Sequence, residues 1–129
     1  MARILIVEDN PDNMKLFRAI LAMNGHEVTA LLSGEGLLET LERTKPELIL
    51  MDIQLPGKDG FALLAEIRSS PWATSRVIAL TAHAMSGDRE KARAAGFDDY
   101  ISKPIDIGTF PGQVTRALSG QPTDPKDAR

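Results

Sequence analysis

The chain has 129 residues, of which 43% are hydrophobic, and this length and apolar share suit one domain with an ordinary core. Its formal net charge of -3 argues against a general nucleic-acid binder, which needs clustered lysine and arginine, so we expect no DNA binding. The lack of cysteine excludes disulfides and cysteine zinc sites, and no apolar run is long enough for a signal sequence or a membrane span. We therefore expect a cytoplasmic protein without membrane insertion.

Five short runs of apolar residues predict β-strands, at 4–7, 27–32, 47–52, 76–81 and 97–101. Apolar residues at helical spacing follow each run and predict helices over about 12–23, 34–45, 60–70, 87–95 and 106–118. Asn10 or Asp12 can cap the first helix, Ser86 begins the fourth, and Pro111 is unusual in the last unless it lies in the first turn. Residues 120–129 are polar and contain proline, which predicts a flexible C-terminal tail after a domain spanning 1–119.

This alternation of strand and helix predicts the fold class. Short connections between alternating strands and helices produce right-handed crossovers and a parallel sheet with helices on both faces. We expect an α/β fold of the flavodoxin-like (βα)5 type, with five parallel strands in the order 2-1-3-4-5.

Chemically active residues follow four of the predicted strands. Glu8 and Asp9 come after the first strand, Asp52 ends the third, Thr81 ends the fourth, and Lys103 follows the fifth. Taken singly, these residues have ordinary roles as caps, strand residues or solvated side chains. The carboxyl ends of parallel strands meet at one edge, however, and strands one and three are neighbours in the predicted order.

Three carboxylates that lie close together repel one another, and a hard divalent cation relieves that repulsion. Mg²⁺ suits such a site because it accepts one or two carboxylates and takes phosphate oxygens as further ligands. Asp52 could then attack a phosphorus atom and become an aspartyl phosphate, while Lys103 neutralises charge and Thr81 donates to a phosphoryl oxygen.

Three segments resemble the receiver domain of two-component response regulators: ILIVEDNPDNMKLF, LILMDIQLPGKDG and VIALTAHAMSGDREKARAAGFDDYISKPI. The resemblance covers about residues 3–118. It implies that Asp52 is the phosphoacceptor and that Mg²⁺ is held by Asp9 directly, by Glu8 through water and by the main-chain carbonyl of Gln54. It also implies that Thr81 and Tyr100 form a switch pair and that Lys103 is the family's lysine, followed by a cis bond to Pro104.

The same resemblance implies a signalling switch that catalyses only its own phosphorylation and dephosphorylation. Its partners would be a sensor histidine kinase or a histidine phosphotransfer protein, and a downstream regulatory protein bound through the fourth helix, fifth strand and fifth helix. The motif sequences are most similar to those of single-domain regulators of cell division and polarity. Gln54 and His83 would tune the loss of phosphate, unless they are simply solvated residues at the rim.

Three other functions share parts of this pattern. A magnesium-dependent phosphatase of the haloacid dehalogenase type needs a second aspartate two residues after the nucleophile, where this chain has Gln54. A flavin or nucleotide binder needs a glycine-rich loop after the first strand, but the loop EDNPDN would repel phosphate. A docking module that works without phosphorylation remains the third alternative.

Overall fold

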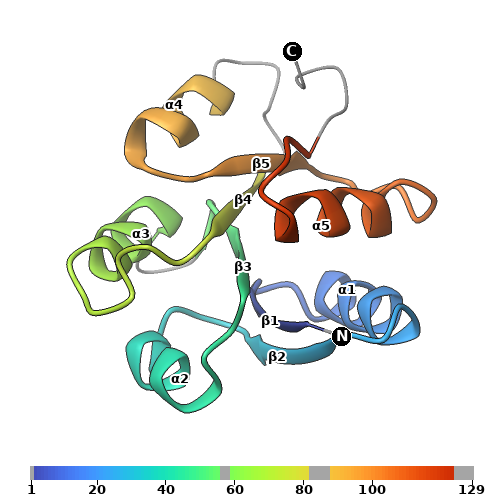
Figure 1. Cartoon of the computed structure of the whole chain (residues 1–129), viewed down its shortest axis with the longest axis horizontal. Helices are drawn as coiled ribbons and strands as arrows, with labels where there is room; N and C mark the ends of the chain where they lie inside the picture. The colour runs from blue at the N-terminus through green and yellow to red at the C-terminus, as the bar shows by residue number, and fades with distance from the viewer. Residues whose placement is uncertain (1, 56–58, 82–87, 124–129) are drawn as a thin grey trace.

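The computed structural model describes residues 2–55, 59–81 and 88–123, and its strands form one parallel sheet (Figure 1). The strands are β1 (Arg3–Val7), β2 (Glu27–Leu31), β3 (Leu48–Asp52), β4 (Val77–Thr81) and β5 (Asp99–Ser102). Their order is β2-β1-β3-β4-β5, and every pairing is parallel. The predicted flavodoxin-like (βα)5 fold and strand order are therefore confirmed.

The helices cover both faces of this sheet. Helices α1 (Pro11–Met23) and α5 (Phe110–Leu118) lie on one face, and α2 (Leu37–Thr44), α3 (Gly60–Arg68) and α4 (Asp88–Ala95) lie on the other (Figure 1). All residues of β3 and β4 are buried, which explains why their sequences are almost continuously apolar. None of the helices formed by the described residues is long and apolar enough to cross a bilayer.

The two cores are separated by the alternation of side chains along each strand. On β1, Ile4 and Ile6 pack toward α1 and α5, whereas Leu5 and Val7 pack toward the opposite helices. The rings of Phe17 and Phe110, 5.5 Å apart, join α1 to α5. Tight packing on both faces fixes the strand ends, and the candidate site is built on those ends.

Two helices begin at side-chain caps beside the carboxyl edge of the sheet. Asn10 caps α1, where its side-chain oxygen accepts the Asn13 N–H at 3.0 Å, so the predicted cap is confirmed. Asp59 caps α3 in the same way and accepts the Ala62 N–H at 2.9 Å. These caps fix the start of α1 just after β1 and the start of α3 after β3.

Several predicted boundaries are wrong by a few residues; the second helix, for example, begins at Leu37 and not near residue 34. The last helix begins at Phe110 instead of Asp106, because the Asp106 carboxylate accepts the Gly108 N–H at 2.7 Å in a turn. Pro111 therefore lies in the first helical turn, where its missing N–H costs little. The fifth strand begins at Asp99, because the Phe97 N–H still donates to Ala92 at the end of α4. The predicted start of α4 at Ser86 lies outside the described residues.

The predicted tail differs from expectation in its described part. Thr123 is only 2% exposed, and its hydrogen bonds to β5 hold it against the sheet. The folded body thus extends at least to Thr123, past the boundary predicted at residue 119, because a buried polar residue with main-chain and side-chain partners is not frayed. Residues 124–129 lie outside the described part of the chain.

Candidate functional site

Three carboxylates gather at the carboxyl ends of the two central strands. Glu8 and Asp9 directly follow β1, and Asp52 is the last residue of β3, the strand beside it. One carboxylate oxygen from each residue lies within 4.8 Å of the other two. Glu8 is fully buried and Asp52 is 2% exposed, whereas Asp9 is exposed. We call this group of two buried carboxyl groups and one exposed carboxyl group the acidic notch.

Lys103 reaches this notch from the end of β5. Its Nζ donates to Asp52 Oδ2 at 2.9 Å and to Glu8 Oε1 at 3.2 Å, and its side chain is 18% exposed. The Lys103 N–H also donates to the main-chain oxygen of Thr81 at 2.7 Å, which ties this segment to the end of β4. The Lys103–Pro104 bond is cis, as the family resemblance implies.

Burial and like charge make the notch hard to ionise completely. Burial raises the pKa of Glu8 from 4.5 to about 7; the Asn10 N–H lowers it, and the Asp52 carboxylate raises it further. Burial alone would lower the pKa of Lys103, but its hydrogen bond to Asp52 and the charges of Asp52 and Glu8 raise it instead. Lys103 therefore stays protonated, and its ammonium contacts two of the three carboxyl groups, those of Glu8 and Asp52.

The acidic notch fits a hard divalent cation. Its donors are carboxylate oxygens, which Mg²⁺ prefers. Burial, and to a smaller extent the Asp52 carboxylate, raises the pKa of Glu8, and a bound cation would favour its ionised form. Exposed Asp9 leaves one side of the site open to water and to a phosphoryl group. Asp9, Glu8 and Asp52 are thus the residues that would hold the ion, and the main-chain carbonyl of Gln54 stays a predicted further ligand.

The backbone around Asp52 holds its carboxylate in place. The Gln54 N–H donates to Asp52 Oδ1 at 2.9 Å, so this oxygen and the Oδ2 bound by Lys103 both have donors. The side chain of Gln54 itself is exposed. Residues 56–58 and 82–87, which include His83, lie outside the described part of the chain.

Gly60 is a site residue that sequence reasoning did not single out. A Cβ atom at Gly60 would lie 2.6 Å from the main-chain oxygen of Asp52 and 2.7 Å from the Cα of Ile53. The start of α3 therefore approaches the backbone of Asp52 more closely than any side chain allows. The Asp59-Gly60 pair was visible in the sequence, but only as the lead into a helix.

The two predicted switch residues occupy different depths. Thr81 is 3% exposed and ends β4 opposite Ser102, next to the segment that carries Lys103. Tyr100 lies opposite Ala79, two residues before that end, and is half-buried against the core under α3 and α4. The structure thus brings Thr81 to the same sheet edge as the acidic notch, whereas Tyr100 belongs to the neighbouring surface formed by β5.

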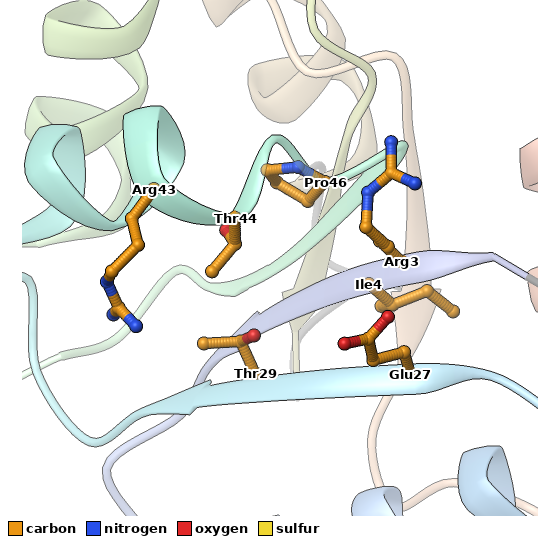
Figure 2. Close-up of a pocket in the computed structure, with 7 residues that line it drawn as sticks. All are labelled: Arg3, Ile4, Glu27, Thr29, Arg43, Thr44 and Pro46. Atoms are coloured by element: carbon orange, nitrogen blue, oxygen red, sulfur yellow. The ribbon is translucent and has the colours of Figure 1, made fainter.

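A separate cavity lies at the opposite end of the sheet. Its volume is about 310 Å³, and its lining comes from the starts of β1 and β2 and the end of α2 (Figure 2). The lining residues are Arg3, Ile4, Glu27, Thr29, Arg43, Thr44 and Pro46. Since Arg3 begins β1 while Glu8 follows its end, this cavity is not part of the acidic notch.

The response regulator receiver domain model matches residues 4–114, and the chain belongs to this family. It is similar to the polar-differentiation response regulator DivK of Brucella ovis, with 43% identity over 113 residues that cover 83% of this chain and 88% of that protein. DivK of Brucella anthropi is 42% identical over the same shares.

Solved receiver structures agree with this assignment. The receiver domain of sensor histidine kinase PA1611 from Pseudomonas aeruginosa PAO1 is 37% identical, with a TM-score of 0.82 over 92% of this chain and 98% of that one. That structure has a magnesium ion coordinated in its active-site cleft. A response regulator from Chloroflexus aurantiacus is 28% identical, with a TM-score of 0.84 over the same shares.

Proposed function

We propose that this receiver domain is a phosphorylation-dependent switch in which Asp52 accepts a phosphoryl group. The observation that carries the proposal is the contact of Lys103 Nζ with Asp52 Oδ2 at 2.9 Å, beside two further carboxylates. A carboxylate nucleophile, a fixed ammonium and a cation site are the parts that phosphoryl transfer to aspartate requires. The predicted phosphatase alternative lacks an acid at position 54, because Gln54 cannot protonate a leaving alcohol.

In the proposed reaction, an Asp52 carboxylate oxygen attacks the phosphorus of an activated donor such as a phosphohistidine or acetyl phosphate. The new O–P bond forms as the bond to the donor breaks, and the electron pair leaves with the donor. Lys103 neutralises developing charge, and the Thr81 hydroxyl donates to a phosphoryl oxygen. Mg²⁺, when bound by the acidic notch, would screen the repulsion between the carboxylates and the phosphoryl oxygens.

The phosphoryl group adds about -1.5 to -2 charges at neutral pH to an edge that is already acidic. We propose that Thr81 moves toward this group and that Tyr100 rotates inward, which changes the surface of α4, β5 and α5. A differential contact energy of about 1 to 3 kcal/mol would shift partner affinity by about 5- to 150-fold.

The proposed partners are a sensor histidine kinase or histidine phosphotransfer protein and a downstream regulatory protein. By likeness to the polar-differentiation regulator DivK, the proposed process is cell polarity. The proposed location is the cytoplasm, as expected from the sequence.

The first experiment is incubation with acetyl phosphate and Mg²⁺, followed by intact mass. We expect one added phosphate on the wild-type chain and none on Asp52→Asn, which removes the nucleophile but keeps the shape. Asp12→Asn is the matched control, since Asp12 is an exposed acid in the first turn of α1 and should leave the added mass unchanged. An equal adduct on Asp52→Asn would contradict the proposal.

A further inference from the structure

The chain does not leave the domain at the end of α5 but turns back toward the sheet. Gly120 has a φ of +77°, and its N–H donates to Ala117 at 3.1 Å, while the Gln121 N–H donates to Arg116 at 2.9 Å. These two bonds are the Schellman arrangement, which ends a helix and reverses the chain. The reversal directs residues 121–123 across β5 (Figure 1). We call these three residues the C-terminal strap.

Thr123 fastens the strap to β5. Its N–H donates to Asp99 Oδ2 at 2.9 Å, and its hydroxyl donates to the main-chain oxygen of Tyr100 at 2.8 Å. Arg116 of α5 holds the preceding residue, because its Nε donates to the Pro122 oxygen at 2.7 Å. With Thr123 only 2% exposed, the strap is a packed element and not a loose end.

Asp99 connects the strap to α4. Its carboxylate is 3% exposed, and Oδ1 accepts the Tyr100 N–H at 2.9 Å and an Arg93 guanidinium nitrogen at 3.2 Å. The other oxygen, Oδ2, accepts the Thr123 N–H. A buried carboxylate needs such donors. Release of the strap would remove the Thr123 N–H from the Asp99 carboxylate, which also contacts Arg93 of α4.

The strap therefore contacts α5 and β5 directly and is linked to α4 through Asp99, so it lies on the surface that the proposed function assigns to partner binding. Arg116 lies on α5, Asp99 and Tyr100 on β5, and Arg93 on α4. Within the described residues β5 pairs only with β4, so its other edge is where the strap lies. We infer that the C-terminal strap is an autoinhibitory segment that occupies the α4–β5–α5 surface and is loosened by phosphorylation of Asp52. This inference rests on the proposed function.

The coupling follows from the anchors. The carbonyl that holds the Thr123 hydroxyl belongs to Tyr100, the residue proposed to rotate, and hydrogen bonds weaken steeply once their geometry is disturbed. A partner that needs this surface must displace the strap, so the strap favours the conformation that does not bind. Linkage is reciprocal: if phosphorylation weakens the strap, weakening the strap must favour phosphorylation.

The first test measures amide hydrogen exchange at Thr123 by NMR, with intact mass recorded on the same sample. In excess acetyl phosphate and Mg²⁺, we expect exchange of the Thr123 N–H to become about tenfold faster, within the range for coupled sites. Asp52→Asn should show no change. If phosphate adds but exchange at Thr123 is unchanged, the inference is overturned and the proposed function stands. If no phosphate adds, both fail.

The second test uses side-chain variants of the full chain. Thr123→Ala removes the hydroxyl bond to Tyr100 and should raise the equilibrium ratio of phosphorylated to unphosphorylated chain in acetyl phosphate about fivefold, the lower end of such couplings. Thr123→Ser keeps the hydroxyl and should restore the wild-type ratio. Thr115→Ala is the matched control, because the Thr115 hydroxyl donates to Pro111 within α5. A merely structural role would lower stability in Thr123→Ala without raising this ratio, and that result would overturn the inference.

Discussion

Each end of the sheet carries an ion pair, and the two pairs differ in how deeply they are buried. At the carboxyl end, Lys103 and Asp52 are 2.9 Å apart, with side chains 18% and 3% exposed. At the amino end, beside the cavity of Figure 2, Arg3 and Glu47 are 3.8 Å apart and about half exposed. Water screens the second pair, whereas burial makes the first pair and its neighbour Glu8 depend on one another. We therefore expect a change of charge to disturb the structure more at the carboxyl end than at the amino end.

The largest expected effect comes from removing the cation at each end. Lys103→Met leaves two buried carboxylates without their ammonium and should lower the free energy of unfolding by about 3 kcal/mol at pH 8. Arg3→Met is the matched change at the exposed pair and should cost less than about 1 kcal/mol. Denaturant unfolding in a chelator measures both values. Equal losses would show that burial does not distinguish the two ends.

The next effect is the pH dependence of Glu8 in the absence of divalent cations. Its pKa is raised to about 7 in the folded chain, so the folded state binds the proton more tightly than the unfolded chain does. Stability from Glu8 is therefore fully present below its ordinary pKa of 4.5 and is lost as the pH rises through about 7. The full loss should be on the order of 3 kcal/mol, since the pKa rises from 4.5 to about 7 and one pKa unit corresponds to about 1.4 kcal/mol.

Denaturant unfolding from about pH 5 to pH 8 measures this loss as the difference between the wild-type chain and Glu8→Gln, which carries no titrating proton. We expect the wild-type chain to lose stability relative to the variant as the pH rises. Parallel curves for the two proteins would mean that Glu8 ionises as freely as an exposed glutamate.

The smallest expected effect tests the close approach at the carboxyl end. Gly60→Ala places a methyl group against the backbone of Asp52 and Ile53, which cannot yield, and should cost about 1.5 kcal/mol and slow phosphorylation. Gly34→Ala is the control, because the three atoms nearest to its Cβ would all belong to the Leu63 side chain and not to backbone, the closest at 2.5 Å. That side chain can shift, so we expect a loss under about 1 kcal/mol. Thermal unfolding and phosphorylation rates compare the two, and a costlier Gly34→Ala would contradict this account.

The sequence by itself determined the fold and most of the side chains that meet at the carboxyl edge of the sheet. Apolar runs of strand length and helical spacing between them are local patterns, and they predicted five strands, their parallel order and four of the residues that meet at the carboxyl edge: Glu8, Asp9, Asp52 and Lys103. Boundaries failed where a side chain outweighed the pattern, as when the Asp106 turn delayed α5.

Only the tertiary structure decided the interaction energies at the site and the path of the C-terminal residues. The raised pKa of Glu8, the contact that excludes a side chain at Gly60 and the bonds of Thr123 to β5 all depend on distances between residues far apart in sequence. Desolvation and steric exclusion are properties of a packed environment, so no local pattern encodes them. The polar composition of residues 120–123 predicted a flexible tail. Composition does not show that the buried carboxylate of Asp99 accepts the Thr123 N–H.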